Sequence, residues 1–178
     1  MPLYFLALLL PEEIADRIVK IKKEVERKYG VRHALNSPPH ITLQKPFRRP
    51  QTDEPLFLEK ISAFASCQSP FNIELSGFDV FAPRVIFVDV TRSKELQDRY
   101  EKLQEFLHAE LGFSSHASGF GFNPHVTIAT RDLKNYFHEV WDDFKNQNFE
   151  ADFVSDALAM LKHNGKSWDV WHQFPWKG

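Results

Sequence analysis

Two short stretches of the sequence follow one pattern, Pro-His-apolar-Thr-apolar. The first contains His40 and Thr42, and the second contains His125 and Thr127. Histidine is the side chain whose ordinary pKa, about 6.5, makes both protonation states available near neutral pH. Two histidines can therefore divide the work of a general acid and a general base between them.

The threonine of each stretch adds a hydroxyl group that can donate a hydrogen bond to an anionic oxygen. Two such pairs suit transfer at a phosphorus centre. One neutral histidine removes a proton from the nucleophile, one imidazolium protonates the leaving oxygen, and the hydroxyls hold the phosphoryl oxygens. We therefore expect His40 and His125 to be catalytic and Thr42 and Thr127 to bind phosphate, with no metal ion and no other cofactor.

The alternation within each stretch predicts a β-strand. Successive side chains of a strand point to opposite faces, so His40 and Thr42 share one face. Ile41 and Leu43 share the other face, and the second stretch has the same parity. One copy alone is weak evidence, because a histidine on a strand is more often a surface or hydrogen-bonded residue. The packing of a strand, however, does not require His and Thr on its unpacked face, so their presence there in both copies favours a function.

Helices are predicted where apolar residues recur at steps of three or four. Gly30 and Gly112 are typical helix stops, and Ser93 is a typical helix N-cap. The predicted elements of the first half are a strand at 3–10, helix 11–29, the motif strand 39–47, helix 53–67 and strand 71–75. The apolar face of the first helix is predicted to comprise Ile14, Ile18, Ile21, Val25 and Tyr29.

The second half repeats this order of elements. Its predicted elements are strand 84–90, helix 93–111, the motif strand from 124, helix 132–146 and strand 149–160, with a final hairpin turning at 163–166. Matching order and spacing indicate an internal repeat. We predict an α+β fold of two pseudo-symmetric lobes, each a mostly antiparallel sheet with helices on its outer face and a groove between them. The chain is expected to be one domain over residues 1–178, with repeats at roughly 1–82 and 83–178.

Composition restricts the partners of the protein. The formal net charge is only -2, so no global basic field draws the chain onto a polyanionic duplex. One cysteine allows neither an internal disulfide nor a cysteine-based zinc site. The apolar run at residues 3–10 is too short to span a bilayer. We expect a cytoplasmic monomer that makes a small, local contact with nucleic acid and has no membrane partner.

The remaining histidines form no recognisable metal-binding spacing, so structural or surface roles are expected for them. His116 lies in the loop before the second motif, where the sequence does not decide between a lid and an ordinary loop. Gly119 and Gly121 of the same loop are not expected to form a phosphate loop, because no predicted strand leads into them and no predicted helix follows directly. The remaining histidines are His33, His108, His116, His138, His163 and His172.

At these motifs the sequence resembles the two-histidine phosphoesterase superfamily, within it the group of 2′-5′ RNA ligases and RNA 2′,3′-cyclic phosphodiesterases. The resemblance rests on "HITL" and "HVTI", and the stretches "LYFLALLLP", "SPPHITLQKPF", "RVIFVDV" and "NPHVTIATRDL" follow the family's order. It implies a V-shaped groove between two lobes and metal-independent opening of a 2′,3′-cyclic phosphate or reversible 2′-5′ bond formation. It assigns His40 and His125 as the acid-base pair, without saying which is which.

Four further residues are candidates for substrate binding. Arg131 would share the face of His125 if the strand continued, and could reach a phosphate or simply open the next helix. Phe5 and Phe87 occupy matching places in the first strand of each half, where they would either stack on a base or pack in the core. Lys45 belongs to a local basic patch that could meet an RNA backbone or remain a solvated loop charge.

We therefore expect the protein to be an enzyme of the phosphoric diester hydrolase class. Its expected substrates are RNA ends or nucleotides that bear a 2′,3′-cyclic phosphate. The same site is expected to have 2′-5′ RNA ligase activity as a second capacity. One alternative keeps the site and changes the substrate to small cyclic nucleotides or 2′-5′ oligoadenylates. The other alternative is a noncatalytic module that binds RNA ends.

Overall fold

The computed structural model describes residues 1–114 and 121–178, so His116 and Gly119 lie outside the described residues. The described chain forms two antiparallel four-stranded sheets flanked by helices, which confirms the predicted α+β fold. The first sheet has the order β2-β1-β7-β8, with β1 at Leu3–Leu9, β2 at His40–Arg48, β7 at Ala157–His163 and β8 at Trp168–Pro175. The second has the order β5-β4-β3-β6, with β3 at Phe71–Phe81, β4 at Val85–Val90, β5 at His125–Thr130 and β6 at Glu150–Ser155.

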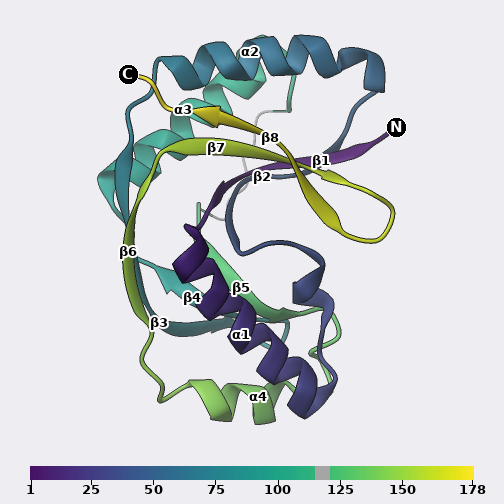
Figure 1. Cartoon of the computed structure of the whole chain (residues 1–178), viewed down its shortest axis with the longest axis vertical. Coiled ribbons are helices and arrows are strands. Elements are labelled where there is room, and N and C mark those ends of the chain that lie inside the picture. The colour runs from purple at the N-terminus through teal and green to yellow at the C-terminus, as the bar shows by residue number, and fades with distance from the viewer. Residues whose placement is uncertain (115–120) are drawn as a thin grey trace.

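Helices lie on both ends of the molecule. Figure 1 shows α2 and α3 beside the first sheet and α1 and α4 beside the second. The four helices are α1 at Glu12–Tyr29, α2 at Glu54–Ser66, α3 at Lys94–Leu111 and α4 at Phe137–Phe144, with short 3₁₀ turns η1 at His33–Asn36 and η2 at Gln51–Asp53. No helix in the described part of the chain is both long and apolar enough to cross a membrane.

The two sheets exchange strands between the two halves of the sequence. Strand β3 comes from the first half but pairs with β4 and β6, and the β7–β8 hairpin comes from the second half but pairs through β7 with β1. The predicted repeat therefore describes the order of elements along the chain, whereas each sheet draws strands from both halves.

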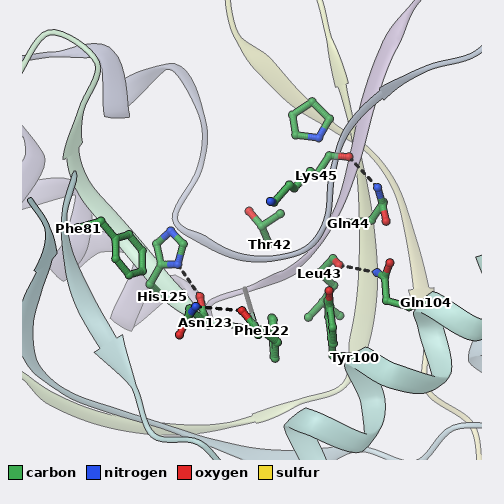
Figure 2. Close-up of a pocket in the computed structure, with 12 residues that line it drawn as sticks. Thr42, Leu43, Gln44, Lys45, Phe81, Tyr100, Gln104, Phe122, Asn123 and His125 are labelled. Carbon is green, nitrogen blue, oxygen red and sulfur yellow. Dashed lines mark hydrogen bonds between the residues drawn. The ribbon is translucent and has the colours of Figure 1, made fainter. Parts of the chain in front are cut away.

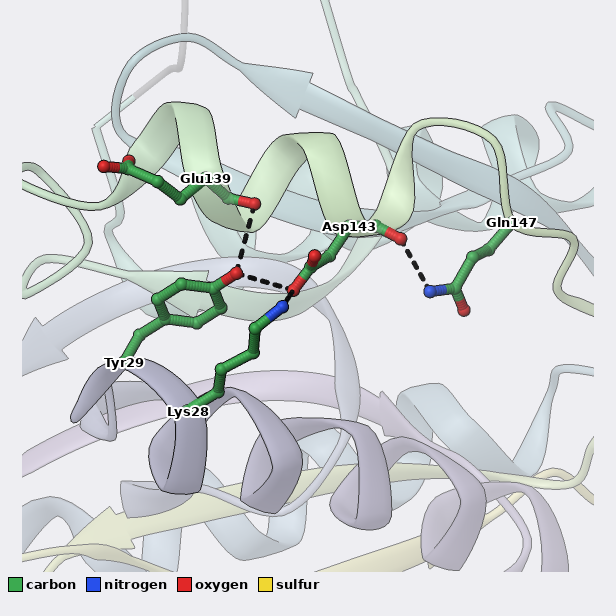
Figure 3. Close-up of polar contacts among 5 residues, drawn as sticks. All are labelled: Lys28, Tyr29, Glu139, Asp143 and Gln147. Carbon is green, nitrogen blue, oxygen red and sulfur yellow. Dashed lines mark hydrogen bonds and ion pairs between the residues drawn. The ribbon is translucent and has the colours of Figure 1, made fainter.

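Helix α1 also crosses to the other lobe. It follows β1 of the first sheet, yet it packs against β5 and α4 of the second sheet. Figure 3 shows how its end is fixed there: the Tyr29 hydroxyl and the Lys28 ammonium each lie 2.6 Å from one carboxylate oxygen of Asp143. In the opposite direction, α3 follows β4 but donates a 2.9 Å hydrogen bond from Gln104 to the Leu43 carbonyl of β2. These crossings join the two lobes.

The helix ends follow the sequence signals. The Ser93 hydroxyl accepts a hydrogen bond from the backbone N–H of Leu96, which confirms the predicted N-cap. Gly30 and Gly112 end α1 and α3 in the left-handed conformation, at φ 72° and 64°.

Two predicted elements differ from the structure. The helix predicted over 132–146 begins only at Phe137, because Arg131 has a positive φ of 58° and residues 132–136 form turns. The Asp132 carboxylate instead accepts hydrogen bonds from the backbone N–H groups of Arg32 and His33. The strand predicted over 149–160 is two strands, β6 and β7, because the chain passes from the second sheet to the first at Asp156.

One large core cluster joins side chains of both sheets and all the helices. A smaller cluster lies on the other face of the first sheet and contains Phe5, Ala7, Ala159 and Leu161. Strand β1 contributes side chains to both clusters, because its side chains alternate between the two faces of the sheet. The second face is the one that carries His40 and Thr42.

Candidate active site

The two motif strands present their histidines and threonines on the partly exposed face of each sheet. His40, Thr42, His125 and Thr127 are all half-buried. The apolar residues between them are fully packed: Ile41 and Leu43 are 0% and 2% exposed, and Val126 and Ile128 are 0% and 1% exposed. The predicted parity of both strands is thus confirmed.

The ring orientation of each histidine is fixed in the same way. The Nδ1–H group of His40 donates to the Pro38 carbonyl at 2.7 Å, and that of His125 donates to the Asn123 carbonyl at 2.8 Å. A carbonyl oxygen only accepts, so each Nδ1 carries the proton and each neutral ring keeps an unprotonated Nε2.

The proline of each motif contributes to this orientation. Pro39 and Pro124 stand between the histidine and the residue whose carbonyl it contacts. A proline biases the residue before it towards an extended conformation, which sets the direction of that residue's carbonyl group. The Pro-His pair repeats because both residues are needed to hold Nδ1.

A buried phenylalanine supports each histidine ring. The ring centroids of Phe5 and His40 lie 4.7 Å apart, and those of Phe87 and His125 lie 5.1 Å apart. Both phenylalanines are only 3% exposed, so they offer little surface to a nucleobase. Their matching places in the two halves reflect this shared packing role.

A second aromatic side chain lies outside each buried phenylalanine. Trp168 of β8 contacts the Phe5 ring edge-on at 4.6 Å, and Phe81 of β3 contacts the Phe87 ring at 4.5 Å. Phe81 also meets the His125 ring edge-on at 5.1 Å and is 40% exposed. These outer rings, rather than Phe5 and Phe87, have surface available for stacking.

Burial lowers the pKa of both histidines. The pKa of His40 falls to about 4, mainly by burial and further through the charges of Lys22 and His125, against a raising effect of its Pro38 bond. Burial also lowers the pKa of His125, while its Asn123 bond and the carboxylate of Asp89 oppose the fall. Both histidines are therefore mainly neutral at pH 7 in the free protein.

The two histidines border adjoining pockets that share Thr42. The aromatic pocket, about 400 Å³, lies beside His125 and is lined by Phe81, Tyr100 and Phe122, as Figure 2 shows. Tyr100 and Phe122 stack in parallel, with ring centroids 4.1 Å apart. Thr42 contributes to this pocket and also to the next.

The basic pocket, about 240 Å³, lies beside His40. His40 and both threonines line it, so it includes the space between the two motif strands. Its other polar walls carry positive or neutral groups: Lys22, His33, Asn36, Ser37, Thr130 and Arg131. The site thus has one aromatic side and one cationic side.

The structure places the remaining predicted residues as follows. Arg131 lines the basic pocket, although the strand ends at Thr130 and the expected strand parity does not bring it there. Arg131 has a positive φ of 58°, and strained backbone of this kind in a non-glycine residue is frequent at binding sites. Lys45 is exposed, lines the aromatic pocket, and extends towards Thr42 in Figure 2.

Sequence reasoning missed Lys22, His33, Phe81 and Trp168. One signal for Lys22 was present: the buried face of α1 is Ile14, Ile18, Lys22 and Val25, so a lysine occupies a position of the apolar stripe. The predicted stripe used Ile21 instead, which is only half-buried. A charged residue at a position of the apolar stripe indicates a charge that is buried in the folded protein and held by specific partner groups.

Potential metal ligands do not gather within residues 1–114 and 121–178. No group of three or more His, Cys, Asp or Glu side chains in these ranges could hold an ion.

A two-lobed α+β fold in which two His-x-Thr strands border one site defines the class of two-histidine phosphoesterases. The model of the 2′-5′ RNA ligase superfamily matches residues 10–167. The chain belongs to this superfamily, and the resemblance seen in the motifs is confirmed.

Relatives and solved structures agree with this membership. A presumed phosphoesterase of Geobacillus kaustophilus is 30% identical over 163 residues, 89% of each chain. The crystal structure of TT0787 from Thermus thermophilus superposes with a TM-score of 0.70 at 24% identity, covering 100% of this chain and 99% of that one. E. coli LigT complexed with 3′-AMP gives a TM-score of 0.71 at 17% identity, covering 100% of both chains. The family and its named relatives support a phosphoesterase.

Proposed function

We propose that this protein is a metal-independent 2′,3′-cyclic phosphodiesterase that acts on RNA ends or nucleotides, and that the same site forms a 2′-5′ phosphodiester when a 5′-hydroxyl takes the place of water. The observation that carries the proposal is the meeting of two His-Thr pairs at adjoining pockets that share Thr42. A phosphate bound between the two motif strands would meet a base, an acid and two hydroxyl donors. The 3′-AMP bound to LigT, a protein of the same fold, supports a nucleotide ligand.

The reaction balances with these groups alone. A water oxygen attacks phosphorus and loses a proton to the Nε2 of one histidine. The bond between phosphorus and one ribose oxygen breaks, and the other histidine donates its Nε2 proton to that oxygen. Thr42 and Thr127 donate hydrogen bonds to the phosphoryl oxygens as negative charge develops on them. When a ribose 5′-hydroxyl replaces water and the bond from phosphorus to the 3′ oxygen is the one that breaks, the product is a 2′-5′ linkage and the 3′ oxygen leaves as a hydroxyl.

The surroundings favour His40 as the base and His125 as the acid. Lys22 disfavours a second positive charge at His40, whereas Asp89, the cross-strand partner of His125, favours a charge there. The singly protonated free enzyme therefore carries its proton mainly on His125. A cyclic phosphate monoanion stabilises that imidazolium further when it binds between the strands.

The test is incubation with an oligoribonucleotide that ends in a 2′,3′-cyclic phosphate. We expect conversion to one phosphomonoester, identified as 2′ or 3′ against standards, and full activity with chelator present. Addition of a 5′-hydroxyl oligonucleotide should yield a 2′-5′ joined product. A requirement for added metal would overturn the mechanism, and tight binding without turnover would favour a noncatalytic RNA-end module. A panel of cyclic mononucleotides and 2′-5′ oligoadenylates separates small substrates from RNA ends.

A further inference from the structure

Lys22 is a buried cation at the wall of the basic pocket. Its side chain is 3% exposed, and its ammonium group donates to the backbone carbonyls of Ala34 at 2.9 Å and Ser37 at 3.4 Å. Burial lowers its pKa to about 8, so the group still carries its charge at neutral pH. Three N–H bonds are available to an ammonium group, and these two carbonyls account for two of them.

This buried charge has no carboxylate partner among the described residues. Transferring an ammonium group out of water is costly, and buried charges in proteins are generally paired with an opposite charge or a ligand. Neutral carbonyls satisfy hydrogen bonds without neutralising the charge. An anion in the basic pocket would supply the missing negative charge.

One neighbour, Arg131, makes the pocket more cationic. Arg131 lines it, is exposed and forms no ion pair with any residue that the structure describes. It lies near enough to His33 for its charge to lower the pKa of that ring, after burial as the main cause. The nearby Asp132 carboxylate accepts two backbone hydrogen bonds and does not line the pocket.

We propose that the basic pocket binds a second phosphate group, the one on the 5′ side of the nucleotide that carries the cyclic phosphate, with Lys22 as its buried anchor and Arg131 at its rim. This rests on the proposed function, because the second phosphate is placed relative to the reacting one. On a ribose, C1′ carries the base and C4′ carries the 5′ carbon, so these two groups lie beyond opposite ends of the C2′–C3′ edge that bears the cyclic phosphate. The reacting phosphate, held by Thr42 and Thr127 between the motif strands, then directs the base to the aromatic pocket and the 5′ phosphate to the part of the basic pocket that Lys22 and Arg131 line.

The experiment compares adenosine 2′,3′-cyclic phosphate with the same compound bearing a 5′-phosphate, at fixed ionic strength. In the unmodified protein, the 5′-phosphate should raise kcat/KM about 10- to 100-fold, as expected for hydrogen bonds to charged groups. Lys22→Met and Arg131→Gln should each bring this ratio towards one. Lys20→Met is the matched control, since Lys20 is an exposed lysine of the same helix, and it should keep the ratio.

Binding provides a second measurement that does not depend on turnover. Adenosine 3′,5′-bisphosphate should bind more tightly than 3′-AMP in calorimetry, and Arg131→Gln, a surface substitution that does not threaten folding, should remove the difference. Hydrolysis of both cyclic compounds at equal kcat/KM would refute the second phosphate site and leave the proposed function intact. Tighter binding of the bisphosphate without hydrolysis of either cyclic compound would refute the proposed function and support the phosphate site.

Discussion

The His40 half and the His125 half of the site share a framework and differ in their surroundings. In each half, a strand places His and Thr on its free face, a carbonyl two residues earlier holds Nδ1, and a buried phenylalanine supports the ring. These features depend on strand alternation and on the Pro-His pair, which both halves have in their sequence.

The surroundings come from elements that the two halves contribute unequally. Helix α1 brings the cation of Lys22 to His40, whereas β4 brings the carboxylate of Asp89 to His125. One pocket is cationic and the other is aromatic. The comparison teaches that duplication supplies two equivalent proton-transfer groups, and that the differences around them give the substrate one orientation.

The largest effect is expected from removing either histidine. His40→Ala and His125→Ala should each lower kcat for cyclic-phosphate hydrolysis by about 10²- to 10⁴-fold, because each removes one proton-transfer partner. The double variant should be little worse than the single ones, since the two groups act together. Unchanged thermal unfolding is the control. Substantial activity of either single variant would show that the halves do not form one site.

A substrate with a good leaving group separates the two histidines. A nucleoside 4-nitrophenyl phosphate needs no proton on its leaving oxygen, so loss of the acid should matter less for it. His125→Ala should therefore recover much of its activity on this substrate, while His40→Ala should not. The opposite result would exchange the roles of base and acid that we propose.

The threonines should give the next largest effect. Thr42→Val and Thr127→Val should each lower kcat about 10²-fold, as loss of one hydrogen-bond donor to a developing oxyanion does elsewhere. Thr→Ser at each position keeps the hydroxyl and should keep most of the activity. Thr42 lines both pockets, whereas Thr127 lines only the basic pocket. A larger loss of kcat for Thr42→Val than for Thr127→Val would therefore sharpen the comparison of the two halves. An unchanged kcat in both variants would contradict phosphate binding by the threonines.

Much of this framework could be predicted from the sequence. Period-two alternation predicts which face of each motif strand is free, and Gly30, Ser93 and Gly112 predict helix ends through local backbone chemistry. These features are set by residues within a few positions of one another.

The differences between the halves could not be predicted because they depend on long-range packing. The sequence does not tell that α1 crosses to the second sheet, and hence that Lys22 lies beside His40. Arg131 lines the basic pocket from just beyond the end of β5 and has a positive φ, which the strand pattern does not reveal. Phe81 comes from β3, which pairs outside its own half of the chain, and Trp168 comes from a hairpin that joins the sheet of the other half through β7, so the spacing around the motifs does not identify them.

The two outer aromatic side chains, Phe81 and Trp168, should differ in how much they contribute to substrate binding. Phe81 lines the aromatic pocket, where we place the base, whereas Trp168 lines the basic pocket. Phe81→Leu should raise KM for adenosine 2′,3′-cyclic phosphate about 10-fold, in line with base stacking on an aromatic side chain. Trp168→Leu is the matched substitution and should raise it less. Equal effects would mean that the two pockets do not divide base and phosphate.

The smallest expected effect is on the pH dependence of kcat/KM, which reports the pKa values of the free enzyme. Both histidines have lowered pKa values, with His40 at about 4, so the bell-shaped profile should have its maximum below pH 6.5.

Asp89→Asn removes an anion that raises the pKa of His125, and should move the alkaline limb of this profile to lower pH by less than about one unit. Lys22→Met removes a cation that lowers the pKa of His40, and should move the acidic limb to higher pH by a similar amount. Both variants thus narrow the profile, from opposite sides. Movement of the acidic limb by Asp89→Asn would mean that His125 titrates below His40, and a flat profile between pH 5 and 9 would contradict paired histidines.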